Sequence, residues 1–279
     1  MDPISSVMYG ILINILTKSV NNLWEFRKKL ILRESLSSKS KGKKGLILLV
    51  SNTESAMFAI ENQLHLIEPE GLPERILERI WLIHSNDKQQ EYFGPGTVIL
   101  VRKIIERCME LVQKKQVLSL EITLNGEVWS GAKDNEESFQ NGLNQKSKDL
   151  SLSLSLESSE RPSLEDNSVV KIKISNKTSD AKLSLKPLKI KVENAVSPGD
   201  AQDTYRLVND IFRKSDYLPS DIIADFTGGN KPMSFGMIMA CLSEERELQY
   251  VSFNPETKKM NGPFVLESYQ YSLFDLKEE

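Results

Sequence analysis

The run Asp225-Phe-Thr-Gly-Gly-Asn-Lys-Pro-Met233 contains the residue types that bind a small anion. It follows an apolar stretch typical of a buried strand and precedes a stretch with helical spacing, so we expect a strand-to-helix turn. Gly228 and Gly229 lack Cβ atoms, which lets backbone N–H groups approach a phosphate closely. The expected helix start adds partial positive charge, and Lys231 adds a full charge. Thr227 and Asn230 add hydrogen-bonding side chains.

Two other polar segments follow apolar runs that are typical of buried strands. Ser51, Asn52 and Thr53 come directly after the run 45–50, and Ser85 and Asn86 come after the run 79–84. Open α/β sheets bind their ligands beyond the carboxyl ends of parallel strands, where such loops gather. The segment after the first run, which joins a predicted strand to a predicted helix, is therefore a second candidate ligand loop.

These loops need a framework of alternating strands and helices, and the sequence predicts one. Strand-like runs occur at 45–50, 79–84, 188–193, 221–226 and 248–253, and helical spacing occurs at 54–66, 97–114, 203–214 and 233–242. Such alternation implies right-handed crossovers between parallel strands. We therefore expect an α/β fold: a Rossmann-like, mostly parallel sheet with helices on both faces.

Residues 117–187 depart from this alternation. Asn125-Gly126 is a strong hairpin signal, and the stretches 150–156, 169–174 and 181–186 alternate with period two. The segments around 131–149 and 157–168 are rich in Asn, Glu and Ser and are expected to be mobile. We interpret 117–187 as an insertion of β-hairpins and loops within a domain that spans 45–279.

The first 32 residues predict a separate helix. Apolar residues recur at helical spacing over 4–26, Arg27, Lys28 and Lys29 follow, and a Ser/Lys-rich linker occupies 33–44. The helix is long enough, at about 34 Å, to cross a bilayer core, and the basic cluster would keep its C-terminal side in the cytoplasm. Lys18 and three asparagines are costly in lipid unless helices assemble with their polar faces inward. Membrane insertion on oligomerisation, an interfacial or partner-docking helix, and a helix packed on its own domain all remain open.

Composition excludes several functions. The formal net charge is −3, so binding of long nucleic acid is not expected. Two cysteines and two histidines make no recognised zinc pattern, and no metal or cofactor is expected. Cys108 and Cys241 lie in apolar runs and are predicted to be buried free thiols. No residue is assigned a catalytic role: Arg79 and His84 have ribonuclease-like spacing but bracket a predicted buried strand.

The 225–233 run resembles the D-x-T-G-G-T-K-x-M signature of CRISPR-associated Rossmann fold (CARF) domains. Asn230 stands where that family more often has Thr; both are small and form hydrogen bonds. The resemblance covers about 45–115 and 188–279. It implies a homodimer that binds a cyclic oligoadenylate, such as cyclic tetra- or hexa-adenylate, across its two-fold axis. It implies binding roles for Asp225, Thr227, Gly228, Gly229, Asn230 and Lys231, with Ser51, Asn52 and Thr53 in the same pocket and Ser85 and Asn86 farther out.

The output of such a sensor is expected in the N-terminal helix, because no effector motif is recognisable elsewhere. In arrangement the chain resembles CARF proteins with one N-terminal membrane helix, which implies a protein at the bacterial or archaeal inner membrane, with a cytoplasmic sensor, that perturbs the bilayer when the messenger binds. Two alternatives stay open. One is a metal-independent ring nuclease that uses Thr53, Thr227 or Lys231, and the other is a cytoplasmic adaptor whose helix docks onto a partner.

Overall fold

The computed structural model describes residues 42–64, 77–86, 97–114, 116–125, 128, 139–157, 169–176, 187–242 and 245–266. The chain divides into two compact units, Met1–Lys39 and Ser40–Glu279, and every described residue belongs to the second. The predicted N-terminal helix at 4–26 and the predicted strand at 181–186 lie outside the described residues. In the part of the chain that is described, no helix has the length and apolar character to cross a membrane.

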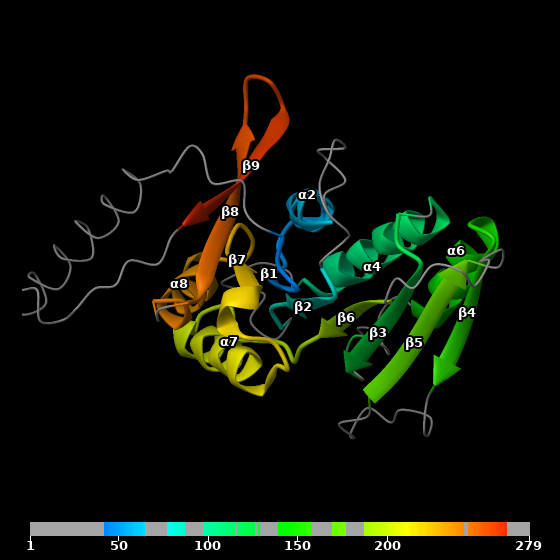
Figure 1. Cartoon of the computed structure of the whole chain (residues 1–279), viewed down its shortest axis with the longest axis horizontal. Helices are drawn as coiled ribbons and strands as arrows, with labels where there is room; N and C mark the ends of the chain where they lie inside the picture. The colour runs from blue at the N-terminus through cyan, green and yellow to red at the C-terminus, as the bar shows by residue number, and fades with distance from the viewer. Residues whose placement is uncertain are drawn as a thin grey trace, which may run out of the picture. The chain divides into compact units, whose positions relative to one another are not determined.

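The described residues form one sheet of nine strands in the order β4-β5-β3-β6-β2-β1-β7-β8-β9 (Figure 1). The strands are β1 (Gly45–Leu49), β2 (Arg79–Ile83), β3 (Ser119–Asn125), β4 (Leu152–Glu157), β5 (Val169–Asn176), β6 (Leu188–Val192), β7 (Ile222–Asp225), β8 (Glu247–Asn254) and β9 (Lys259–Leu266). All neighbours from β3 to β8 in this order pair in parallel, whereas β4, β5 and β9 add antiparallel pairings at the two ends. The predicted α/β fold with a mostly parallel sheet is confirmed.

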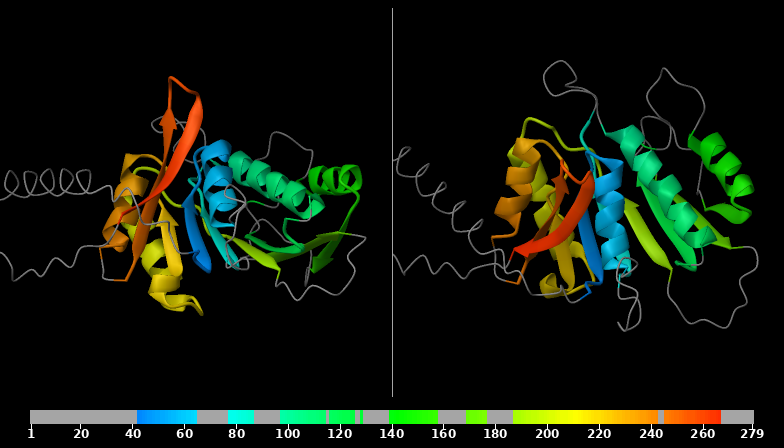
Figure 2. Two further views of the ribbon diagram at one scale, coloured as in Figure 1. Left: turned by 45° about the horizontal axis from the view of Figure 1, so that its top comes forward. Right: turned by 90° about the horizontal axis from the view of Figure 1, so that it is seen from above.

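Helices cover both faces of this sheet (Figure 2). They are α2 (Thr53–Gln63), α4 (Val98–Gln113), α6 (Phe139–Asp149), α7 (Ala201–Lys214) and α8 (Lys231–Ala240). The first three pack on one face and the last two on the other. In β1, Leu46 and Leu48 enter the first core and Ile47 and Leu49 the second. A strand buried on both faces must be apolar at every position, which explains the continuous run that predicted it.

The segment 117–187 differs in part from the sequence-based interpretation. Its strands β3, β4 and β5 extend the main sheet, and β3 lies parallel to β6. The hairpin expected at Asn125-Gly126 does not fit, because β3 pairs with β5 and β6. Residues 139–149, expected to be a mobile loop, form α6. Only Phe139, Leu143 and Ser147 are buried there, four residues apart on one helical face, so average composition concealed the helix.

Two residues at the end of the predicted linker belong to the sheet domain. Lys43 is 9% exposed, and its Nζ donates to the Ser220 carbonyl oxygen at 2.8 Å and to the Glu247 carboxylate. The backbone N–H of Lys44 donates to the carbonyl oxygen of Asp221. Lys43 and Lys44 are thus held by the sheet domain, and the charged group of each has a partner there.

Strand β9 was not predicted. Its sequence contains Asn261, Gly262 and Pro263, which are uncommon in strand interiors. Among the described strands it lies at the edge of the sheet and pairs with β8 alone, and an edge strand tolerates a proline because one of its sides needs no hydrogen bonds.

Gly236 of α8 provides a test of the packing between α7 and α8, and Gly142 of α6 serves as its control. A Cβ atom added at Gly236 of α8 would lie 2.2 Å from the carbonyl oxygen of Ala201, so we expect Gly236→Ala to lower the free energy of unfolding by about 1–3 kcal/mol. At Gly142 of α6 nothing lies within 4 Å of an added Cβ, and Gly142→Ala should raise stability by about 0.5–1 kcal/mol. Urea unfolding measures both. Equal stability of the Gly236→Ala variant and the natural protein would contradict the close helix contact.

Candidate ligand-binding site

The three polar segments predicted to bind a ligand follow the carboxyl ends of three neighbouring strands in the middle of the sheet. Strand β1 lies between β2 and β7 and runs parallel to both. Leu49 is level with Ile83, and Leu48 is level with Asp225, so the three strands end at nearly the same height. Parallel strands with matched ends bring their exit loops together. The structure thus places 50–53, 84–86 and 226–230 side by side.

A pocket of about 440 Å³ lies at these strand ends, a volume within the range typical of small-molecule sites. It is lined by Val50, Ser51, Ser85, Thr97, Ile99, Leu100, Pro198, Gly229, Asn230 and Met233. Four of the lining residues were singled out from the sequence: Ser51, Ser85, Gly229 and Asn230. The others were missed, although Pro198 belongs to a Ser-Pro-Gly-Asp turn that also follows a strand, and that signal pointed to the same strand ends.

Both glycines of the 225–231 turn are required by the fold itself. A Cβ at Gly228 would lie 1.8 Å from the carbonyl oxygen of Leu49, because this turn packs directly against the end of β1. Gly229 has φ of +79°, in the region that residues with a side chain rarely adopt. The sequence-based reason for these glycines was close approach to a phosphate, but packing and backbone conformation already account for both.

Asp225 and Thr227 hold the turn in shape. The Asp225 carboxylate is 2% exposed and accepts hydrogen bonds from the Thr227 backbone N–H at 2.9 Å and from Gln249 Nε2 at 3.0 Å. The Thr227 hydroxyl oxygen accepts from the backbone N–H of Val251 at 2.6 Å. Neither residue is among those lining the pocket. The Asp225 side chain is enclosed by protein in this conformation, and its contact with a ligand stays a prediction.

Asn230 and Lys231 begin helix α8 at the pocket. The Asn230 side chain caps the helix by accepting from the backbone N–H of Met233 at 3.2 Å, and its Nδ2 donates to the carbonyl oxygen of Pro198. This second bond ties the turn to the loop before α7. Lys231 is exposed, and no hydrogen bond or ion pair in the described part of the chain engages its side chain. Its ammonium group is therefore available to a ligand.

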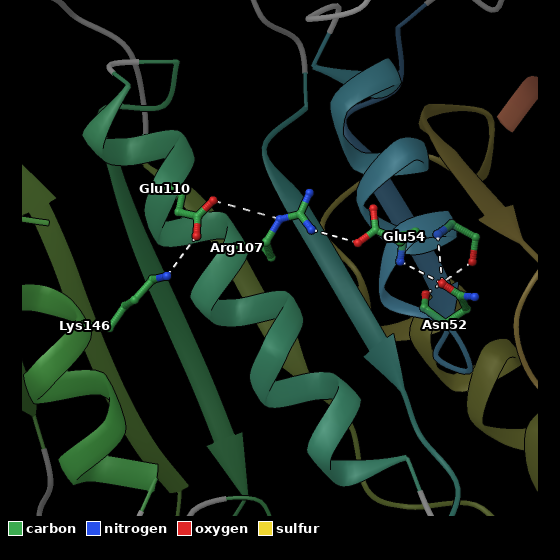
Figure 3. A network of polar contacts seen from close by, with 6 residues as sticks. Asn52, Glu54, Arg107, Glu110 and Lys146 are labelled. Atoms are coloured by element: carbon green, nitrogen blue, oxygen red, sulfur yellow. Dashed lines mark hydrogen bonds and ion pairs between the residues drawn. The ribbon is translucent and has the colours of Figure 1, made fainter. Parts of the chain in front are cut away.

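The predicted ligand loop 51–53 contributes one residue to the pocket and two to the start of helix α2. Ser51 lines the pocket, whereas Asn52 caps α2 by accepting from the backbone N–H of Glu54 at 2.7 Å, and Thr53 is the first helical residue. Figure 3 shows how the capped helix start continues into ion pairs that reach α4. There Arg107 contacts Glu54 at 2.9 Å. These exposed pairs link the start of α2 to α4 but contribute little stability individually.

The loop after β2 contributes a buried hydroxyl. Ser85 is 6% exposed, and its backbone N–H donates to the Thr97 hydroxyl at 2.9 Å. Thr97 directly precedes α4, and its side chain makes no capping bond to that helix. Asn86 donates its backbone N–H to the carbonyl oxygen of Val196, and its Oδ1 is buried with no hydrogen-bond partner among the described residues. Of these two residues, Ser85 lines the pocket and Asn86 does not.

Other chemistry finds no support among the described residues. Within those ranges no three His, Cys, Asp or Glu side chains gather closely enough to hold a metal ion. Cys108 and Cys241 are buried free thiols, and burial raises the pKa of each to about 12, which leaves them protonated and unreactive at neutral pH.

Comparison with solved structures gives a weak likeness in fold. No protein-family model matches the chain, and no curated protein matches it. Among solved structures, the chain is similar to Can2 from Sulfobacillus thermosulfidooxidans in complex with cyclic tetra-adenylate, with 10% sequence identity and a TM-score of 0.34. The match covers 80% of this chain and 38% of that one. A likeness of this degree assigns the chain to no family.

Titration of Asp225 provides a test of its burial. Desolvation raises the pKa of the Asp225 carboxyl above its ordinary value of 3.8, against hydrogen bonds from Thr227 and Gln249 that lower it. The stability that this group contributes is therefore complete below pH 3.8 and is lost as the pH rises through its folded-state pKa. We therefore compare the free energy of unfolding of the natural protein with that of the Asp225→Asn variant. The difference, natural protein minus variant, should fall as the pH rises from 3.8 through the folded-state pKa of Asp225. A difference that stays constant or increases with pH contradicts the burial.

Proposed function

We propose that this chain is a sensor that binds a cyclic oligoadenylate in the pocket at the ends of β1, β2 and β7. The observation that carries the proposal is the Thr-Gly-Gly-Asn-Lys turn, which lies beside Ser51 and Ser85 and leads directly into helix α8. A helix start with a free lysine next to a pocket is a site for phosphate, because its N–H groups and positive charge both favour an anion.

Each part of the pocket suits one part of a nucleotide. A phosphate fits at the start of α8, where Lys231 is exposed and has no partner in the described part of the chain. The hydroxyls of Ser51 and Ser85 suit ribose oxygens. Apolar side chains of Leu100, Met233 and the 62% exposed Ile99 offer a surface for an adenine. A symmetric homodimer would present two such pockets to a ring that has the same two-fold symmetry.

Binding is tested by calorimetric titration of the full chain with cyclic tetra-adenylate and cyclic hexa-adenylate. At least one ring should bind, and Lys231→Ala should weaken binding about 10- to 150-fold, since a hydrogen bond to a charged group contributes about 1.5–3 kcal/mol. The matched control is Lys148→Ala, which removes an exposed lysine from the end of α6, beside the other end of the sheet, and should bind normally. If neither ring binds the natural protein, the proposed function is wrong.

Sensing is favoured over cleavage of the messenger. Thr227, one candidate for assisting phosphodiester cleavage, uses its hydroxyl oxygen to accept a hydrogen bond from the Val251 backbone N–H at 2.6 Å. A hydroxyl engaged in this way is poorly available to a scissile phosphate. Incubation with labelled ring should therefore return the ring intact, and chromatographic detection of linear products would favour the nuclease instead.

The proposed output lies in the segment 4–26, whose helical pattern of apolar and polar residues suits insertion into a membrane on assembly. The messenger would then drive these helices to perturb the inner membrane of a bacterial or archaeal cell. In cells that express the full chain, we expect a dye for membrane potential to report depolarisation when messenger is supplied, but not with Lys231→Ala. Unchanged potential, with all of the protein in the soluble fraction, would exclude this output and leave a helix that docks onto a partner.

A further inference from the structure

A chain of buried hydrogen bonds begins at the 225–231 turn, here called the ligand turn, and runs into the centre of the domain. At its outer end the Thr227 backbone N–H donates to Asp225 Oδ1 at 2.9 Å, and Gln249 Nε2 donates to Asp225 Oδ2 at 3.0 Å. Gln249 lies on β8, directly beside Asp225, and is completely buried. Both carboxylate oxygens are thereby held, so the turn that begins at Phe226 has a fixed starting point.

The line continues to Lys43, which lies two residues before β1. Gln63 is 2% exposed at the end of α2, and its Nε2 donates to Gln249 Oε1 at 3.0 Å. Its Oε1 accepts from the backbone N–H of Lys43 at 3.4 Å. Lys43 follows the Ser/Lys-rich segment that connects the N-terminal residues to this domain. The line thus connects the ligand turn with the place where the N-terminal segment joins the sheet.

The direction of every bond in this line is fixed by its two ends. A backbone N–H can only donate, so Gln63 must turn its oxygen toward Lys43 and its nitrogen toward Gln249. Gln249 must then accept from Gln63 and donate to the Asp225 carboxylate, which can only accept when ionised. Neither amide can rotate alone without placing two donors or two acceptors in contact. The orientation of each amide therefore depends on that of the other.

We propose that Lys43, Gln63, Gln249, Asp225 and Thr227 form a relay that couples the ligand turn to the attachment of the N-terminal segment. Gln63 and Gln249 are positioning residues: they lie away from the pocket lining and act through Asp225. Ligand that holds the turn in its present conformation then also favours the bond at Lys43. Linkage requires the reverse as well, so the state of the Lys43 contact changes the affinity for the ligand. This inference rests on the proposed function, because it needs a ligand at the turn.

Amide hydrogen exchange on the full chain tests the coupling directly. The amides of Lys43 and Lys44 donate to Gln63 and Asp221, and their exchange reports opening at the attachment point. Saturating cyclic tetra- or hexa-adenylate, whichever binds by calorimetry, should slow this exchange at least about fivefold, the lower end of typical coupling between sites. The Gln63→Met variant loses the side-chain hydrogen bonds to Gln249 and Lys43, while the methionine side chain has a shape similar to that of glutamine. In that variant the ligand should change exchange by less than about twofold while calorimetry still detects binding.

The control separates coupling from simple loss of stability. Leu143→Ala opens a cavity under α6 and touches no relay residue, so it should exchange faster overall yet keep the ligand effect at Lys43 and Lys44. If Gln63→Met does not fold, Gln63→Asn withdraws the amide by one methylene and serves in its place. Binding without slower exchange at these amides in the natural protein overturns the relay alone, and so does an undiminished effect in the Gln63 variant. Absence of binding overturns the proposed function itself.

Discussion

The carboxylate of Asp225 is buried between the end of β7 and the adjacent strand β8, and the residue is only 2% exposed. Protein groups must supply the hydrogen bonds, because a buried carboxylate without partners is very costly. The backbone of Thr227 and the side chain of Gln249 meet this demand. The same bonds determine the path of the turn, place Gly228 against Leu49 and start α8 at the pocket. The shape of the candidate site therefore follows from the need to stabilise one side chain.

The rest of the fold provides what that turn needs. Parallel pairing of β2, β1 and β7 with matched ends brings three exit loops to one edge, and the helices that follow β1 and β7 begin there with asparagine caps. Asn230 also bonds to Pro198, which adds the loop before α7 to the same cluster. Most polar groups at the carboxyl ends of these strands cap helices or stabilise turns. Ser51, Ser85 and Lys231 are therefore the side chains best able to contact a ligand.

The sequence was sufficient to predict the central framework and insufficient for the network that supports the site. Strands such as Gly45–Leu49 are apolar throughout because both of their faces are buried, and that pattern is local. Helix α6 was not predicted because only three of its residues are buried. Strand β9 was not predicted because, as an edge strand, it shows no clear alternation of buried and exposed residues. Gln63 and Gln249 are 186 positions apart, and nothing local in either indicates a partner. For the same reason Asp225 was assigned to the ligand rather than to the turn.

We propose above that a cyclic oligoadenylate binds at the turn that leads into α8. A crystal structure of the full chain with cyclic tetra-adenylate, or with cyclic hexa-adenylate if only that ring binds, tests it most directly. We predict a phosphate within hydrogen-bonding distance of Lys231 or of the backbone N–H groups of Gly229 and Asn230, with Ser51 or Ser85 near a ribose. A ring bound at another surface, with the pocket beside Gly229 empty of ligand, would contradict the account.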